Sequence, residues 1–276
     1  AALAADLGLA QLKAVGLSSR PLGPNRRCVR PMPLAASSAV RLVFAHRGGG
    51  DHGGRENSAA AFARALRAGV HLESDIRLSR DGEPVLIHDV FTLVDGVPVA
   101  PALLSADALA GIGVLRLADL YRMFGTAFEL SLDVKVAGAA LPAIEVARSA
   151  GAVARMWLVH EDRDLLRSIR ARDRSVRLVH EATARVRGAP GFDHDRYLDS
   201  LAADRVDAQN SPPEAWTAAG VAAAHARGIA AFGSLLNDTA RLSQGRSLGL
   251  DAVYTDEIAM ATAVLGGPVS PPVSRL

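Results

Sequence analysis

The chain has 276 residues, of which 49% are hydrophobic but only 4% aromatic, and its formal net charge is +2. This length suits one large domain. The positive charge excess is small and the sequence has no motif that reads nucleic acid, so we do not expect a nucleic-acid partner. The single cysteine, Cys28, excludes a disulfide within the chain, and no uncharged apolar run reaches the roughly 18 residues of a membrane span, so stable membrane insertion is not expected.

Residues 1–40 are predicted to form an N-terminal arm, a short helix followed by a flexible linker rich in proline and arginine. The first residues lack the basic stretch and methionine of a signal peptide. The compartment stays open on this basis, with a soluble cytoplasmic protein favoured over a secreted one. Residues 41–276 are expected to form the folded domain.

The first predicted strand, Val43-Phe44-Ala45, runs into His46-Arg47 and three glycines. A buried strand that ends in a glycine-rich loop lets the backbone approach an anion closely, and the guanidinium fork of Arg47 suits phosphate oxygens. Next comes Glu56, just before a helix predicted over 58–67. This carboxylate either stabilises the helix start or supports Arg47 or a metal, and the sequence does not choose between these interpretations.

The second strand, 70–79, alternates so that Glu73 and Asp75 lie on one face. Two carboxylates one residue apart suit a hard divalent cation, which prefers oxygen ligands. A solvated strand face would carry the same residues, but the flanking His46 and His88 favour a site.

Asp81-Gly82 follows and predicts a two-residue hairpin turn, with a return strand from Pro84 to His88. Counting back along both arms of such a hairpin puts His88 opposite Asp75, with Cβ atoms roughly 5 Å apart. A slip of one residue would send His88 to the other face.

The rest of the chain alternates short apolar strands with helices, which predicts a (β/α)8 TIM barrel with a small hairpin insertion after the second strand. Strands are predicted near residues 41 and 70 and over 128–135, 155–160, 176–180, 206–209, 229–234 and 252–255. Helices are predicted over 58–67, 117–124, 141–150, 163–171, 196–203, 213–227 and 239–248. Residues at strand ends face the pocket of such a barrel, so the pairs His160-Glu161, His180-Glu181 and Gln209-Asn210 are further candidates for substrate contact.

This set of motifs resembles the glycerophosphodiester phosphodiesterase family: His46-Arg47-Gly, Glu56-Asn57-Ser58, Glu73-x-Asp75, Asp81-Gly82 and His88-Asp89, in that order. The resemblance extends through Asp133-Val-Lys135 to Asp256 and implies the same barrel. It implies that His46 and His88 are the acid/base pair, that Glu73, Asp75 and Asp133 bind one divalent cation, Ca²⁺ or Mg²⁺, and that Arg47 and Lys135 hold the phosphate.

The implied activity is metal-dependent hydrolysis of glycerophosphodiesters to glycerol 3-phosphate and an alcohol, with a small-molecule substrate as partner. Two alternatives are a phospholipase D-like enzyme acting on lysophospholipid or sphingolipid, and a non-catalytic barrel that binds phosphoesters. The chain departs from the family at Ser234-Leu-Leu-Asn237, where a Trp-Thr-x-Asn stretch is common. Without this tryptophan the pocket loses an aromatic wall, so the motif does not identify the leaving alcohol.

Overall fold

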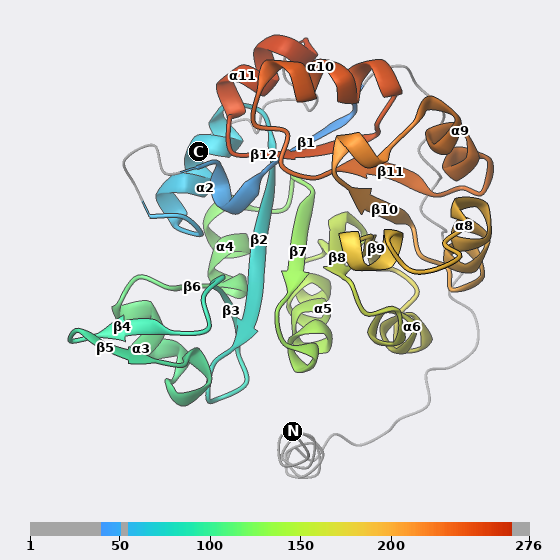
Figure 1. Cartoon of the computed structure of the whole chain (residues 1–276). Coiled ribbons are helices and arrows are strands. Elements are labelled where there is room, and N and C mark those ends of the chain that lie inside the picture. The colour runs from blue at the N-terminus through green and yellow to red at the C-terminus, as the bar shows by residue number, and fades with distance from the viewer. Residues whose placement is uncertain (1–39, 51–54, 267–276) are drawn as a thin grey trace. The chain divides into compact units, whose positions relative to one another are not determined.

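A computed structural model describes residues 40–50 and 55–266, all within one compact unit that spans 31–276. Apart from its last residue, the predicted arm over 1–40 lies outside the described residues. Eight parallel strands form a ring that closes where the first pairs with the second (Figure 1). In ring order they are β1 (Leu42–Ala45), β2 (His71–Leu78), β7 (Leu130–Val134), β8 (Met156–His160), β9 (Arg177–Glu181), β10 (Ala208–Ser211), β11 (Ala230–Gly233) and β12 (Ala252–Thr255). The predicted eight-stranded barrel is confirmed.

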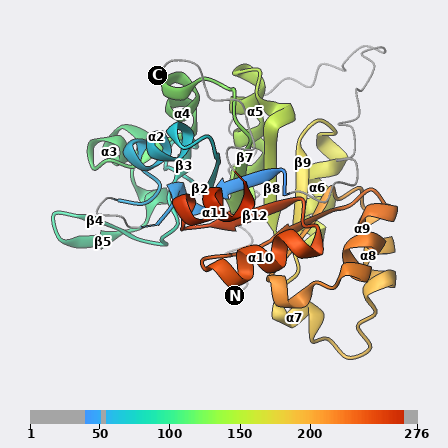
Figure 2. The ribbon, with the colours of Figure 1, turned by 90° about the horizontal axis from the view of Figure 1, so that it is seen from above.

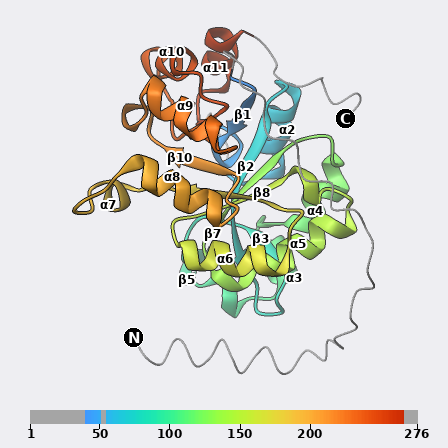
Figure 3. The same ribbon diagram turned by 90° about the vertical axis from the view of Figure 1, so that its right-hand side faces the viewer.

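Helices lie outside this ring (Figures 1 and 3). They are α2 (Ala59–Arg67), α4 (Leu117–Phe124), α5 (Ala140–Ser149), α6 (Arg163–Arg172), α7 (Ala184–Arg187), α8 (His194–Ala203), α9 (Ala218–Ala226), α10 (Thr239–Leu248) and α11 (Ile258–Leu265), with single 3₁₀ turns η1 (His46–Gly48), η3 (Ala137–Ala139), η4 (Val153–Arg155) and η5 (Pro213–Ala215). The helix α4 is typical, since Leu117, Leu120, Tyr121 and Phe124 recur at helical spacing and are buried. Within 40–50 and 55–266, no helix is long and apolar enough to cross a bilayer.

The core has two layers of different composition. Between strands and helices it is mostly aliphatic, as the low aromatic content predicts. Inside the ring, however, Phe44 stacks on Tyr254 with centroids 5.2 Å apart, and Trp157 packs against Phe232 at 5.0 Å. A few large rings fill a narrow barrel interior that small side chains would leave open. They form a floor beneath the polar residues at the carboxyl ends of the strands.

The segment between β2 and α4 is larger than a single return strand. It contains β3 (Pro84–Leu86), the hairpin of β4 (Thr92–Val94) and β5 (Val97–Val99), the 3₁₀ turn η2 (Pro101–Leu103), α3 (Ala106–Gly111) and β6 (Leu115–Arg116). β3 pairs antiparallel with β2, and β6 pairs antiparallel with β3, so both extend the barrel sheet beyond β2. Figure 2 shows the β4–β5 hairpin projecting from the barrel.

The predicted register of the β2–β3 hairpin is wrong by one residue. Ile76 faces Leu86, and the Ile87 amide donates to the Asp75 carbonyl at 3.0 Å, so Ile87 rather than His88 lies opposite Asp75. The turn has three residues, 80–82, and of these only Gly82 has a positive φ, at 82°. Asp81 stabilises this longer turn, because its carboxylate accepts hydrogen bonds from the Ser79 hydroxyl and the Ala106 amide.

Candidate active site

A cavity of about 230 Å³ opens at the carboxyl ends of the barrel strands. Among the described residues its walls are His46, Arg47, Glu73, Asp75, Asp133, Lys135, Val159, Glu181, Asn210, Ser234, Leu235 and Tyr254. Six of the predicted site residues are therefore brought together from β1, β2 and β7. This is the end of the barrel at which enzymes of this architecture carry their active sites.

Glu73 and Asp75 lie deep in the wall on β2, exposed by only 6% and 2%. Arg47 donates its backbone N–H to Glu73 Oε2 at 2.8 Å, from a left-handed backbone conformation with φ of 52°. Burial, and then the neighbouring Asp75, raise the pKa of Glu73 to about 8, although the charge of His46 and the Arg47 amide oppose this. The Glu73 carboxylate is thus a buried acid that lacks a full positive partner.

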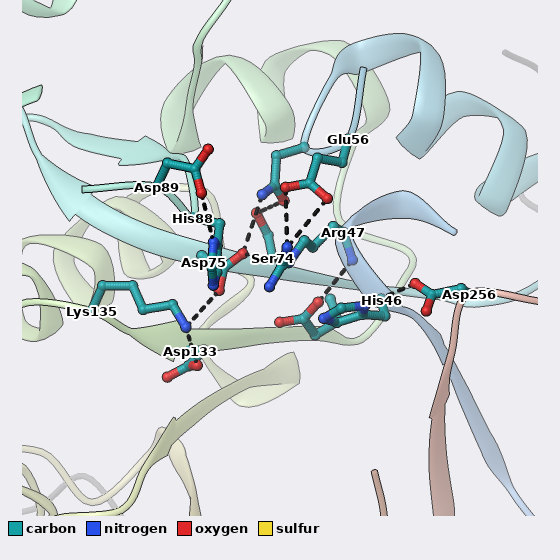
Figure 4. Close-up of polar contacts among 12 residues, drawn as sticks. His46, Arg47, Glu56, Ser74, Asp75, His88, Asp89, Asp133, Lys135 and Asp256 are labelled. Atoms are coloured by element: carbon teal, nitrogen blue, oxygen red, sulfur yellow. Dashed lines mark hydrogen bonds and ion pairs between the residues drawn. The ribbon is translucent and has the colours of Figure 1, made fainter. Parts of the chain in front are cut away.

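The Arg47 guanidinium lies between two acids (Figure 4). Nη1 donates to both Glu56 oxygens at 3.1 and 3.2 Å, and Nε is 3.3 Å from Asp75 Oδ2 without the alignment of a hydrogen bond. The cap of α2 is Ser58, whose hydroxyl accepts from the Ala61 amide. These contacts favour the interpretation in which Glu56 supports Arg47 over the one in which it stabilises the start of the helix.

Lys135 bridges the carboxylates of the two neighbouring strands. Asp75 and Asp133 are paired in the β2–β7 register, and Lys135 Nζ lies 3.0 Å from the first and 2.6 Å from the second. Burial lowers the pKa of the Lys135 ammonium, but the charges of Asp133 and Asp75 outweigh it and raise the pKa above its usual value. Lys135 therefore stays positively charged in the cavity.

His46 has a carboxylate partner from the last barrel strand. Its Nδ1 is 2.8 Å from Asp256 Oδ1 (Figure 4). Asn237 donates to the other oxygen of Asp256 at 2.5 Å. Burial lowers the pKa of His46, but its hydrogen bond to Asp256 and the charges of Glu73 and Asp256 raise it above its ordinary value. The hydrogen bond to His46 likewise lowers the pKa of Asp256. The contact thus favours the imidazolium form of His46 and the carboxylate form of Asp256.

His88 lies at the rim rather than in the cavity wall. Its side chain is 35% exposed, and Nδ1 is 2.9 Å from the carboxylate of Asp89. Its carbonyl oxygen accepts hydrogen bonds from the Arg77 guanidinium, which holds the chain where β3 ends. Although the predicted register is wrong, His88 is not turned into the protein interior.

The donor chemistry of the cavity fits a hard divalent cation. Glu73, Asp75 and Asp133 all present carboxylates to it, and among the described residues Glu73 has only the Arg47 amide as a hydrogen-bond donor. Within the same residues, no three acidic, histidine or cysteine side chains already lie close enough together to hold a metal. Two of the three carboxylates, Asp75 and Asp133, are instead paired with Lys135.

Several residues at the cavity were not singled out from the sequence. Asp256 follows β12, and Asn57 donates to Asp75 Oδ2 at 3.2 Å while its own oxygen accepts from Ser74. The Tyr254 hydroxyl bonds to Ser131 at 2.8 Å in the floor. Glu181 and Asn210, which the strand-end argument marked only as candidates, both line the cavity, whereas His180 is buried against Tyr197 and the Glu161 carbonyl.

Comparisons with known proteins agree with this site. Residues 46–123 match the model of the glycerophosphoryl diester phosphodiesterase family. No curated protein sequence matches the chain significantly. Many solved structures share its fold, among them these three. A candidate glycerophosphoryl diester phosphodiesterase of Silicibacter pomeroyi is 19% identical with a TM-score of 0.72, covering 86% of this chain and 96% of its own.

The second is the glycerophosphodiester phosphodiesterase of Thermotoga maritima, 22% identical with a TM-score of 0.70, over 81% of this chain and 97% of that one. The third is an Oleispira antarctica phosphodiesterase in complex with the product sn-glycerol-3-phosphate, 17% identical with a TM-score of 0.67, over 82% and 96% of the two chains. Residues 46–123, which carry most of the motifs of the site, therefore match the glycerophosphoryl diester phosphodiesterase family, and the barrel as a whole has the fold of solved structures that bear this name.

Proposed function

We propose that the protein hydrolyses glycerophosphodiesters to glycerol 3-phosphate and an alcohol. The observation that carries the proposal is one cavity that joins the imidazole of His46, paired with Asp256, to two cationic side chains, Arg47 and Lys135, and to the buried acids Glu73 and Asp75. The Oleispira antarctica phosphodiesterase of the same fold was solved with sn-glycerol-3-phosphate as product. A phosphodiester fits the charges of this cavity, because its oxygens can take the place of Asp75 and Glu56 around the two cations.

Arg47 and Lys135 bind the nonbridging oxygens of the phosphate. The guanidinium offers a planar pair of donors, while the ammonium acts as a point charge. Both are already held in the cavity by acids, so little side-chain freedom is lost when substrate enters. As negative charge gathers on the phosphoryl oxygens in the transition state, these two cations stabilise it.

His46 and His88 exchange protons with the reacting oxygens. Because Asp256 holds His46 in its protonated form, His46 donates a proton to the leaving oxygen. His88, paired with Asp89 at the rim, accepts the proton of the attacking oxygen, which belongs either to water or to the substrate's own glycerol hydroxyl. In the second case the product is a cyclic phosphate, which water then opens to glycerol 3-phosphate. The rim position of His88 requires its side chain to turn toward the bound phosphate.

Glu73, Asp75 and Asp133 hold one divalent cation, Ca²⁺ or Mg²⁺. When bound, this ion polarises the phosphoryl oxygens. Glu73, whose pKa burial raises to about 8, ionises more readily beside such a charge. Asp133, now paired with Lys135, would serve as the third ligand, and the Lys135 ammonium would then be available to the phosphate.

The direct test incubates the protein with glycerophosphocholine, glycerophosphoethanolamine and glycerophosphoinositol, each with and without a chelator. We expect glycerol 3-phosphate to appear and the chelator to stop its formation. Activity that resists the chelator would remove the metal from the proposal. Release of the alcohol phosphate in place of glycerol 3-phosphate would contradict the reaction itself.

A second candidate function is a phospholipase D-like reaction on lysophospholipids. The observation that favours it is the run of exposed apolar side chains directly after His88-Asp89: Val90, Phe91, Leu93 and Val97 are 56–66% exposed. An acyl chain or a lipid surface suits such a stretch. Lysophosphatidylcholine belongs in the same assay, and a product from this lipid alone would favour the second function over the first.

A further inference from the structure

The wall opposite His46 carries a carboxylate that the proposed reaction does not use. Glu181 ends β9, which is four strands from β1 in either direction around the ring. Its side chain lines the cavity. Among the described residues its only hydrogen-bond donor is the neutral amide of Asn210, with Nδ2 at 2.5 Å from Oε2. A carboxylate buried in this way is costly unless a positive group compensates it.

Asn210, on the next strand, adds a second unmet acceptor. The residue is only 4% exposed and lines the same cavity, and its Oδ1 is buried without a hydrogen-bond partner among the described residues. The amide nitrogen is engaged by Glu181, which leaves the oxygen as the free end. A buried acceptor without a donor is rare in folded proteins and signals a missing partner.

The surrounding charges do not supply that partner. Burial first, then the negative charge of Asp133, raise the pKa of Glu181 to about 7, while the Asn210 hydrogen bond and Arg187 oppose the shift only in part. Arg187 donates to the Ala182 carbonyl. Arg185, the other nearby cation, lies 3.7 Å from the exposed Glu161. The Glu181 carboxyl group therefore lines the cavity without a cationic partner from the part of the chain that the structure describes, and a cation that entered beside it would favour its ionised form.

We infer that Glu181 and Asn210 form the subsite for the leaving alcohol and select an alcohol that carries a primary ammonium group. The inference rests on the proposed function. With the phosphate held by Arg47 and Lys135 near β1 and β7, a short substrate that crosses the mouth reaches β9. A primary ammonium brings both a positive charge and N–H donors to the oxygens of Glu181.

A quaternary ammonium group suits this wall less well. It has no N–H to donate, and proteins recognise it chiefly by the faces of aromatic rings. Among the described lining residues Tyr254 is the one aromatic side chain, and its ring is stacked on Phe44 in the floor. Ser234 and Leu235 stand beside the cavity at the place where the family commonly has a tryptophan.

The experiment compares kcat/KM for glycerophosphoethanolamine, glycerophosphocholine and glycerophosphoglycerol, whose alcohols are respectively a primary ammonium, a quaternary ammonium and neutral. We expect the wild type to prefer the first over the second by about tenfold to 100-fold, the range of a hydrogen bond to a charged group. Glu181→Gln keeps the size and the contact with Asn210 but removes the charge. This variant should bring the ratio of kcat/KM for glycerophosphoethanolamine to that for glycerophosphocholine near one, mainly through a change in KM.

Glu161→Gln is the matched control, because it removes a carboxylate at the end of the neighbouring strand that does not line the cavity. It should keep the wild-type ratio within about twofold. Thermal unfolding checks that both variants fold. Without any variant, ethanolamine phosphate should inhibit the wild type more strongly than choline phosphate does.

Equal loss on all three substrates in Glu181→Gln, or a wild-type preference for the choline compound, would overturn the inference while leaving the proposed hydrolysis intact. If the wild type hydrolyses none of the three substrates, calorimetric titration with glycerophosphoethanolamine and with glycerophosphocholine tests the inference by binding alone. Preferential binding of glycerophosphoethanolamine that Glu181→Gln abolishes would sink only the proposed function. Binding without preference, or no binding, would sink the inference as well.

Discussion

His46 and Asp256 are separated by 210 residues in the chain, yet Nδ1 of the one is 2.8 Å from Oδ1 of the other. Closure of the barrel creates this contact, because β1 pairs with β12 from Leu42 through Ala45. The carboxylate orients the imidazole and keeps it protonated, while Asn237 fixes the carboxylate in turn. Asp256 is thus a positioning residue for His46.

Asp256→Asn should lower kcat by about 10²-fold, toward the lower end of what a general acid contributes, because His46 loses the charge that favours its protonated form. The pKa of His46 is raised in the wild type and falls in the variant. Activity needs the protonated imidazole. The alkaline limb of the kcat–pH profile, where the imidazole loses its proton, should therefore shift to lower pH. A pH profile of kcat measures this.

The matched control for that variant is Asp238→Asn, at the exposed N-cap of α10, which keeps a capping side chain. Its pH profile should coincide with that of the wild type. An Asp256→Asn enzyme with an unshifted profile would show that Asp256 does not set the protonation of His46.

Lys135→Met should act in opposite directions on catalysis and on cation binding. Loss of the ammonium removes a charged contact to phosphate, so kcat/KM should fall by about tenfold to 100-fold. Asp75 and Asp133 lose the cation that lies between them, so Ca²⁺ or Mg²⁺ should bind more tightly. Titration calorimetry of the two proteins with each ion measures the second effect, and weaker ion binding in the variant would contradict it.

His88→Ala tests the proposed second proton carrier. We expect a loss of kcat of about 10² to 10⁴-fold with little change in melting temperature, since His88 is partly exposed and contacts only Asp89 through its side chain. His160→Ala, at another strand end but outside the cavity lining, serves as the comparison. Full activity of His88→Ala would remove His88 from the mechanism.

His180 should make stability fall in acid. It is buried, and burial lowers its pKa from 6.5 to about 4 despite the Glu161 carbonyl. Between these two values the unfolded chain binds a proton that the folded chain does not. The contribution of neutral His180 to the free energy of unfolding is therefore fully present above pH 6.5. It is lost as the pH falls toward 4, by up to about 3 kcal/mol.

Denaturant titrations of the wild type and His180→Gln at several pH values between about 7 and 4 test this prediction. The other titrating groups are common to both proteins. The difference between their slopes of unfolding free energy against pH therefore reports His180. The difference between the two unfolding free energies should shrink as the pH falls. Parallel curves would show that His180 titrates alike in both states.

Much of the site was predictable because its residues lie close together in the chain. Alternation along one strand puts Glu73 and Asp75 on the same face, and one apolar strand with its glycine-rich loop places His46 and Arg47 at a strand end. The register of the next turn was not predictable in this way. It depends on a hydrogen bond from the Ala106 amide to Asp81, 25 residues away, which a count of hairpin residues does not include.

By itself the sequence determined the order and kind of the barrel elements, because apolar alternation and helical spacing are local properties that each segment carries alone. Only the tertiary structure decided which distant groups complete the cavity: Asp256 beside His46, Lys135 between two carboxylates, and Glu181 with Asn210 across the mouth. The physical reason is ring closure, since parallel strands far apart in the chain end at one rim and their side chains share one buried, poorly hydrated space.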